Sequence, residues 1–425
     1  MIKALSVFVV LLIFILLDFP IYMATIITGV IYVFAGGISL QSCAIKLFGA
    51  INSQSLMAIP FFIIAGNIMM KSKITGKLVD FANAAVGSLP GGLGHVNIIT
   101  SMLFGGIQGS GAADASAIGG MLIPAMEEQG YDKDYAVAVT AGSSMLSPII
   151  PPSIAMILYS YYTELPVGKL FLGGLVPGIV IGIMMMVVNA LAYRRRKYSI
   201  PLVKFSLKRL LVTTWKSLGA LLMPLIILFG IVFGIVTPTE SGVLAILYGL
   251  IYGFFISRTL KLRDIPAILR DSAVTTAVVL ITIAAAGIVS NVLVRMHFQN
   301  EIQNFAVQVL DNRYLAALFL FLVFIVLGTF LDPTILIAMF ATTVLSVGNS
   351  YGFDPVHFGV IMVIIMQLGA ITPPVGTFLF ISCSVAKLPI EKSAKPLLPY
   401  IAVVILAVVL SLFLPQIVTA LPSLM

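Results

Sequence analysis

The sequence is short of charge, which excludes an ordinary soluble protein. Only 9% of its 425 residues are Asp, Glu, Lys or Arg, whereas a soluble domain has about 25%. Residues that make metal or redox centres are also few. The two cysteines (Cys43 and Cys383) and the three histidines (His95, His297 and His357) are scattered, so we predict neither a transition-metal site nor a disulfide.

Nucleotide and enzyme chemistry are missing as well. There is no G-x-x-x-x-G-K-[ST] phosphate-binding motif, so any energy that the protein uses has to come from an ion gradient. No convergent set of His, Glu, Asp or Cys side chains is evident, and we predict that the protein is not an enzyme. The formal charge of +8 gathers in short connections, which is typical of cytoplasmic loops and does not indicate a nucleic-acid partner.

Hydrophobic residues dominate what is present. They make up 60% of the chain, and the mean hydropathy is +1.14. At about 20 residues per span, this length allows on the order of ten to twelve membrane segments. We therefore predict an all-α polytopic membrane protein in a lipid bilayer.

The most basic stretch is 194–216, which has eight Lys or Arg residues and no acid. The positive-inside rule places it in the cytoplasm. Within it, apolar and basic residues mix at helical spacing. We interpret 199–216 as a helix lying in the membrane interface, with an ordinary cytoplasmic loop as the alternative.

Several hydrophobic segments are broken by small, polar or helix-breaking residues. In 105–124, GGIQGSGAADASAIGGMLIP, glycines, serines and Asp114 interrupt an apolar run. In hydrocarbon, irregular backbone survives only where it is buried or lines a cavity. Three more breaks of this kind occur at 147–153 (SPIIPPS), 328–334 (GTFLDPT) and 369–376 (GAITPPVG). Short helices on either side of Asp18 and Pro20, and a re-entrant hairpin at 47–70, are also predicted.

The two halves of the chain repeat each other. GYD at 130–132 matches GFD at 352–354, and Pro151-Pro152 matches Pro373-Pro374. The distance along the chain is the same for both pairs, so the two matches belong to one repeat without a gap. Repeated pairs of interrupted segments point to the binding site of a transporter. We predict two inverted repeats, 1–193 and 218–425, joined by a basic cytoplasmic amphipathic connector, 194–217.

The breaks offer oxygen ligands for a hard cation such as Na⁺. Unwound segments and half-helix ends supply carbonyl oxygens to coupling ions in transporters. Hydroxyl and amide oxygens come from Ser110, Ser116, Ser143, Ser144 and Ser147 in the first half, and from Thr329, Thr334, Gln367 and Thr372 in the second. We expect at least two ion sites. The alternative is that the small residues only permit close helix crossings.

Three charged residues stand out near these breaks. Arg295 follows a long apolar segment and is predicted to clamp a substrate carboxylate, with an arginine that reaches to the membrane surface as the alternative. Asp114 and Asp332 lie inside breaks, where a carboxylate can bind a cation, a proton or substrate hydroxyl and amine groups. The alternative for both aspartates is a structural role, in which a local hydrogen bond or an internal pair neutralises the carboxyl group. We favour substrate contact for Asp114 and assign Ser116 to the same site.

The sequence resembles a known family. GSGAADASAIGGMLIPAM, the span from GYD to SPIIPPS, and GFDPVHFGVIMVIIMQLGAITPPVG are similar to the large membrane subunit of tripartite ATP-independent periplasmic (TRAP) transporters, over essentially the whole chain. The resemblance implies a multi-pass protein of the bacterial inner membrane, with two re-entrant hairpins, broken helices and an elevator mechanism. It also implies coupling to Na⁺, a small four-helix membrane subunit, here a separate polypeptide, and a periplasmic substrate-binding protein.

The resemblance also implies site residues. The first sodium site falls on Ser110 and on carbonyls around Ser147, Ile150 and Pro152. The second falls on Gly328, Thr329, Gly369 and Thr372. The arginine and aspartates of the sialic-acid branch match Arg295, Asp114 and Asp332. Where the family often has Ser-Gly-Ser, this sequence has Ser110-Gly111-Ala112, so one hydroxyl is missing.

Together these features predict sodium-coupled secondary import of an organic-acid anion. One arginine of the protein suits one carboxylate of the substrate, and two acidic side chains suit a substrate with hydroxyl and amide donors. This favours sialic acid or a similar sugar acid. The alternatives are a C4-dicarboxylate TRAP subunit and an autonomous ion-coupled carrier that needs no binding protein.

Overall fold

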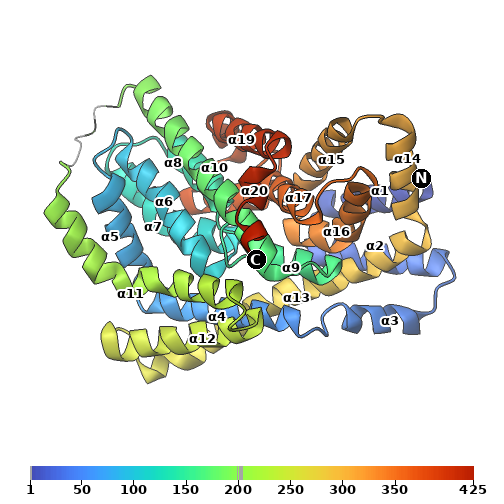
Figure 1. Cartoon of the computed structure of the whole chain (residues 1–425), viewed down its shortest axis with the longest axis horizontal. Helices are drawn as coiled ribbons and strands as arrows, with labels where there is room; N and C mark the ends of the chain where they lie inside the picture. Colours follow the sequence, from blue (N-terminus) through green and yellow to red (C-terminus); the bar gives the residue numbers. More distant parts are fainter. Residues whose placement is uncertain (1, 199, 201–203) are drawn as a thin grey trace.

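The computed structural model describes residues 2–198, 200 and 204–425, and these residues form helices without a β-strand (Figure 1). The helices of the first half are α1 (Ile2–Leu16), α2 (Ile21–Ala35), α3 (Leu40–Gly49), α4 (Ala58–Lys71), α5 (Ile74–Val86), α6 (Gly92–Gln108), α7 (Gly111–Glu128), α8 (Lys133–Ser144), α9 (Ile154–Thr163) and α10 (Val167–Arg195).

The helices of the second half are α11 (Leu207–Val232), α12 (Pro238–Ile251), α13 (Ile265–Arg295), α14 (Phe298–Val309), α15 (Arg313–Gly328), α16 (Pro333–Ser350), α17 (Pro355–Gly369), α18 (Thr377–Ala386), α19 (Ile390–Phe413) and α20 (Gln416–Thr419). Short helical turns, η1 to η4, lie at Ser55–Met57, Tyr252–Ile256, Leu262–Asp264 and Pro422–Leu424.

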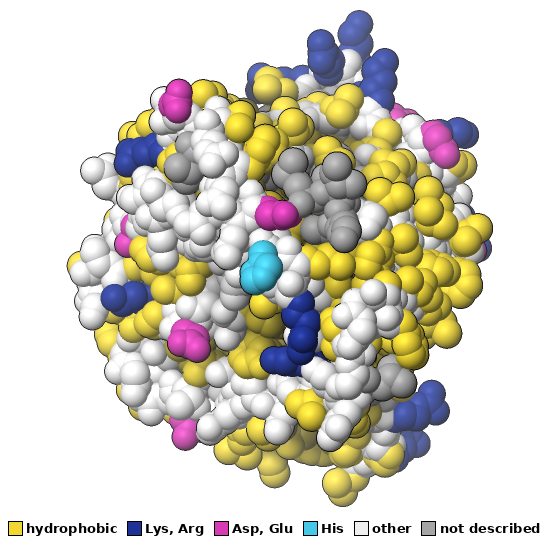
Figure 2. Space-filling model, turned by 90° about the vertical axis from the view of Figure 1, so that its right-hand side faces the viewer, with side chains coloured by type: hydrophobic (Ala, Val, Ile, Leu, Met, Phe, Trp, Pro, Cys, Tyr) yellow, Lys and Arg dark blue, Asp and Glu magenta, His cyan; other side chains and the backbone are white. Residues whose placement is uncertain are grey.

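The fold is that of a polytopic membrane protein. Six described helical segments are long and apolar enough to cross a membrane, and there are seven if the pair Ser55–Lys71 and Ile74–Val86, bent by 72°, is one broken span. Figure 2 shows hydrophobic side chains spread over much of one face, with charged side chains scattered between them or gathered at the rim. The predicted fold class is confirmed.

The order of helices from α6 to α10 is repeated from α15 to α19. The number of residues between the starts of corresponding helices is nearly constant. It is almost the same from Gly92 to Arg313, where the two hairpins begin, as from Ile154 to Thr377, where the second parts of the broken helices begin. In each set, two helices form a hairpin, a broken helix follows, and a long helix closes the set. The hairpins are α6–α7 and α15–α16, and the broken helices are α8–α9 and α17–α18.

The two sets interlock. Each hairpin packs against the broken helix of its own set, as α7 does on α8 and α16 on α17. Each also packs against the other set, because α18 contacts α7 and α16 contacts α9. The long helix α13 contacts α2, α4 and α16 and runs along the lower side of this assembly (Figure 1). The two hairpin tips are therefore brought to one central region.

The predicted re-entrant hairpin at 47–70 is wrong. The structure instead has α3, a connection, and a continuous α4 that runs through Gly66 and Asn67. Pro60 lies in the first turn of α4, where a missing N–H costs no helical hydrogen bond. Gly66 does not break the helix; an added Cβ there would lie 2.9 Å from Cγ of Gln108. Gly66 thus serves close packing against α6.

The basic stretch also differs from its interpretation as a separate interfacial helix. Residues 199 and 201–203 lie outside the described residues. From Leu207 onward the chain is one helix, α11, that continues to Val232 without a break. Ser206 caps its start by accepting a hydrogen bond from the Arg209 N–H at 3.3 Å. The described part of the predicted interfacial helix, from Leu207 to Lys216, is therefore the first part of a helix long enough to cross the membrane, because nothing after Trp215 stops that helix.

A charged cluster joins the end of α10 to the start of α8. Arg196 donates hydrogen bonds to Asp132 at 2.7 Å and to both carboxylate oxygens of Asp134 at 2.8 Å. The Tyr198 hydroxyl donates to Asp132 at 2.7 Å. The Tyr198 hydroxyl first, and the Arg196 guanidinium second, hold the pKa of Asp132 below its ordinary value of 3.8. This cluster fixes the loop between the first hairpin and its broken helix.

We expect Arg196→Gln to lower the melting temperature above pH 4 by roughly 1–3 °C, a small effect because the pairs are partly exposed. A carboxylate with a lowered pKa stabilises the fold above its unfolded pKa, and this stabilisation is lost as pH falls through the folded pKa. The difference between wild type and variant should therefore shrink below pH 3.8, the ordinary pKa of Asp132. Melting curves from pH 6 to 3 test this, with Arg195→Gln as the matched control. An equal difference at every pH would contradict it.

Candidate functional site

The tip of the first hairpin lies on the first broken helix. Gly109, with φ of +63°, turns the chain between α6 and α7. Its carbonyl accepts a hydrogen bond from the Ile154 N–H at 3.3 Å. A Cβ on Gly109 would lie 2.3 Å from the Pro152 carbonyl oxygen, and one on Gly105 would lie 2.6 Å from Cα of Ser147. Only glycine permits this approach, so the tip is seated directly on the break at 147–153.

The second hairpin repeats this contact. A Cβ on Gly328 would lie 2.8 Å from Cα of Gly369, so the end of α15 touches the end of α17 backbone to backbone. The Gly376 N–H donates to the Thr329 carbonyl at 3.1 Å, and the Thr372 hydroxyl donates to the Leu368 carbonyl at 2.8 Å. Each hairpin tip is thus bonded to the unwound segment of a broken helix.

Both hairpin tips are helix starts with polar caps. Ser110 caps α7 and accepts a hydrogen bond from the Ala113 N–H at 3.4 Å. Asp332 caps α16 and accepts one from the Thr334 N–H at 2.8 Å. These residue types are preferred caps because they satisfy N–H groups that the helix leaves unpaired. The remaining free N–H groups give each start a partial positive charge.

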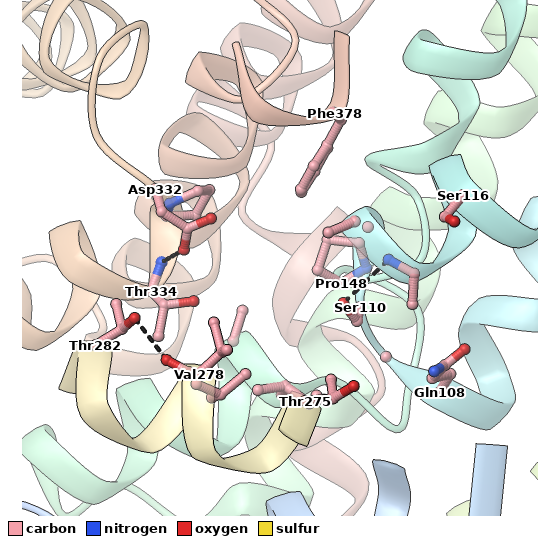
Figure 3. A pocket seen from close by; sticks show the side chains of 18 of the residues that line it. Gln108, Ser110, Ser116, Pro148, Thr275, Val278, Thr282, Asp332, Thr334 and Phe378 are labelled. Carbon is pink, nitrogen blue, oxygen red and sulfur yellow. Dashed lines mark hydrogen bonds between the residues drawn. The ribbon is translucent and has the colours of Figure 1, made fainter. Parts of the chain in front are cut away.

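A cavity of about 710 Å³ opens between the two hairpin starts. Figure 3 shows Asp332 and Thr334 on one side, Gln108, Ser110 and Ser116 on the other, and Phe378 above. One face of α13 forms its floor. The lining residues with polar side chains are Tyr22, Asn67, Gln108, Ser110, Ser116, Thr275, Thr282, Asp332, Thr334 and Gln367. Most of the remaining lining is apolar.

The cavity has one charged side chain among the described residues that line it, and this is Asp332. No Lys or Arg is among those described lining residues. An anion bound here would therefore be neutralised by helix N-termini, neutral donors or a bound cation. Gln108 suits a cation or a donor group of the substrate here: it is 4% exposed, and its Oε1 atom, a hydrogen-bond acceptor, has no partner in the described part of the chain.

The family description "Tripartite ATP-independent periplasmic transporter, DctM component" matches residues 8–417. The chain belongs to this family. It is 33% identical over 385 residues to the C4-dicarboxylate TRAP transporter large permease protein DctM of Pseudomonas aeruginosa, covering 91% of this chain and 90% of that protein. It is 32% identical over 385 residues to the sialic acid TRAP transporter large permease protein SiaM of Vibrio cholerae, with the same coverage.

The fold is shared with more distant transporters. MtrF of Neisseria gonorrhoeae, an antimetabolite efflux pump, superposes with a TM-score of 0.58 at 14% identity, covering 87% of this chain and 82% of that one. This likeness concerns the fold alone. As a DctM-family permease, the chain is a non-enzymatic transport protein of the bacterial inner membrane.

The chain brings some predicted site residues to the cavity. Ser110, Ser116 and Asp332 line it. The other residues of the first predicted sodium site, Ser147, Ile150 and Pro152, are buried. Ser147 and Pro152 lie against Gly105 and Gly109 at the tip of the first hairpin. Those of the second site, Gly328, Thr329, Gly369 and Thr372, gather where α15 meets α17 and do not line the cavity.

Two predicted substrate residues lie elsewhere. Arg295 ends α13, is exposed, and is not among the residues that line the cavity. This position fits the alternative of an arginine at the membrane surface. Asp114 is fully buried and also does not line the cavity. It lies on the opposite face of α7 from Ser116, because two residues along a helix are about 200° apart. In this structure neither residue lines the cavity, and their expected substrate contacts stay predictions.

Sequence reasoning missed the contribution of α13. Thr275, Val278, Val279 and Thr282 line the cavity together, and their spacing of three and four residues is the signature of one helix face. The available signal was a pair of threonines two helical turns apart, Thr275 and Thr282, in an apolar segment. Gln108, directly before the Gly109-Ser110 tip, was a second one.

Proposed function

We propose that this permease imports an organic-acid anion across the inner membrane, driven by a sodium gradient. The observation that supports this most is the pairing of two hairpin tips, each bonded to an unwound break, around one cavity that carries polar side chains from both tips. Breaks of this kind hold substrate and coupling ions in secondary transporters. A small four-helix membrane subunit and a periplasmic binding protein that delivers the substrate complete the proposed system, which works by an elevator movement.

Sodium is favoured by the ligands that the breaks offer. The first proposed site combines Ser110 with carbonyls of the 147–152 segment, and the second combines Gly328 and Thr329 with carbonyls of 369–372. These groups are neutral oxygens, which suit a monovalent hard cation bound by unwound backbone. A cation at either tip also lies near the helix starts that line the cavity, where it would help to neutralise an anionic substrate.

The charge of the cavity bears on the choice of substrate. The two relatives described above are named for C4-dicarboxylate and for sialic acid at nearly equal identity, so their names do not decide it. A dicarboxylate would meet no cationic side chain among the described lining residues and one carboxylate, Asp332. A sugar acid has one carboxylate for the helix starts and several hydroxyls for Asp332, Thr334, Gln108 and Gln367. The cavity therefore favours sialic acid or a similar sugar acid over a C4-dicarboxylate.

The test is uptake into proteoliposomes that contain the permease with its small subunit, supplied with binding protein. We expect an inward sodium gradient to drive accumulation of labelled sialic acid at least tenfold above the level with potassium, and succinate to accumulate far less. Equal uptake without sodium would overturn the coupling. Preference for succinate would overturn the substrate. Robust uptake without binding protein would favour an autonomous carrier.

A further inference from the structure

Asp114 is a buried carboxylate behind the substrate cavity. It is 0% exposed and lies in the first turn of α7, where that helix packs on α6 and α8. The Ser101 hydroxyl donates to its Oδ2 atom at 2.8 Å, and the hydroxyls of Ser144 and Ser147 also face the carboxylate. Its Oδ1 atom has no hydrogen-bond partner among the described residues. The carboxylate thus has unused acceptor capacity inside the protein.

The surroundings of Asp114 are rich in neutral oxygens and lack a positive side chain. Ser101 and Ser143 are in hydrogen-bond contact at 3.2 Å, and Ser143 also donates to Asn97 at 3.0 Å. No salt bridge joins Asp114 to a Lys, Arg or His in the described part of the chain. A buried carboxylate without a partner charge is very costly, so something else has to neutralise it.

The second half shows that the fold does not need these polar groups. In the repeat that pairs Pro151 with Pro373, the positions of Asp114, Ser143 and Ser144 correspond to Leu336, Ile365 and Met366. All three of these apolar side chains are fully buried. The same layer between hairpin and broken helix is therefore built with apolar side chains in one half and with a carboxylate and hydroxyls in the other. Packing alone does not explain Asp114.

We infer that Asp114 is the centre of a further monovalent cation site, occupied by Na⁺. Its ligands are the Asp114 carboxylate and the hydroxyls of Ser101, Ser144 and Ser147. Oxygen ligands suit a hard cation, and a single carboxylate balances one positive charge, whereas protein sites for Ca²⁺ usually have several acidic ligands. The site borders the first proposed sodium site, with which it shares Ser147, through the Ser147 hydroxyl here and through its carbonyl there, and it is separate from the second. It rests on the proposed sodium coupling and adds an ion that ties α7 to α6 and α8.

The test measures sodium binding without substrate. The full chain is purified, and its melting temperature is followed as NaCl replaces KCl at constant ionic strength. A cation that binds only the folded state raises the melting temperature with its concentration. For Asp114→Asn, we expect the sodium concentration that gives half of the stabilisation to rise at least about tenfold, or one step of the titration to disappear. Ser101→Ala keeps the Asp114 charge and removes one ligand. It should also raise the sodium concentration that gives half of the stabilisation.

A second expectation separates this site from a merely structural acid. Without sodium, Asp114→Asn should melt at or above the wild-type temperature, because it removes an uncompensated buried charge. Asp80→Asn, the same change at an exposed position of α5, should match wild type throughout. An unchanged sodium titration in Asp114→Asn would overturn the inference. So would a wild-type melting temperature that responds to pH and not to sodium, because a proton would then occupy the position.

The outcome does not depend on transport. If uptake proves independent of a sodium gradient but the Asp114-dependent sodium shift is present, the ion site stands and the proposed coupling fails. If uptake is sodium-driven and the shift is the same in Asp114→Asn, the coupling stands and this site fails.

Discussion

Replacement of Gly369 by alanine is expected to reduce sodium-driven uptake by roughly tenfold or more, since displacements of about 1 Å in a binding site have effects of this size. An added Cβ would lie 2.4 Å from Cα of Gly328 and 2.6 Å from its carbonyl carbon. These are backbone atoms, which cannot rotate away as the end of a side chain can. The second hairpin would have to move off the break that follows α17, and its proposed sodium ligands would separate.

Gly120→Ala is the matched control for Gly369→Ala. Gly120 also lies in a helix, α7, but an added Cβ there meets nothing within 4 Å. We expect this variant to transport like wild type. Overpacking at Gly369 should also cost about 1–3 kcal/mol of stability, so melting temperature is measured beside uptake. Wild-type uptake by Gly369→Ala would mean that the contact of α15 with α17 is not kept during transport.

The second large effect is expected for Asp332→Asn, which should raise the KM of uptake by about tenfold to a hundredfold. Hydrogen bonds to a charged group contribute about 1.5–3 kcal/mol each, and Asp332 is the charged residue among the described lining of the cavity. Asn caps a helix as well as Asp does, so α16 should stay folded. Asp332→Ala removes the cap too and should lower stability by about 1 kcal/mol in addition.

Asp354→Asn is the control for the loss of charge at a cap. Asp354 caps α17 in the same way, by accepting a hydrogen bond from the His357 N–H at 2.7 Å, but it does not line the cavity. Initial rates over a range of substrate concentrations separate KM from the maximal rate. An Asp332→Asn permease with wild-type KM would show that Asp332 serves as a helix cap alone.

The breaks in the helices were predicted from the sequence because their causes are local. Pro151-Pro152 and Pro373-Pro374 remove backbone donors, and α8 and α17 end before them while α9 and α18 begin after them. Ser110 and Asp332 are side chains that start helices. Charge scarcity in a chain of this hydropathy settled the membrane class, since charged groups are costly in lipid.

The sequence was wrong about Gly66, and gave no direction for other side chains, where a residue's role depends on a distant partner. Gly66 reads as a break, but it makes room for Gln108 of α6. Asp114 and Ser116 are two residues apart, and their opposite directions follow only once α7 is known to be a regular helix from Gly111. Arg295 follows an apolar run in the sequence, and the position of α13 decides that it lies outside the cavity.

By itself, therefore, the sequence determined a membrane protein built from two similar halves, each with a hairpin start and a broken helix at a known place. The tertiary structure decided how the halves interlock, with α18 on α7 and α16 on α9, and which side chains face the cavity. The physical reason is that helix starts and breaks depend on hydrogen bonds between near neighbours. The direction of Asp114, by contrast, depends on the packing of helices that are far apart in the sequence.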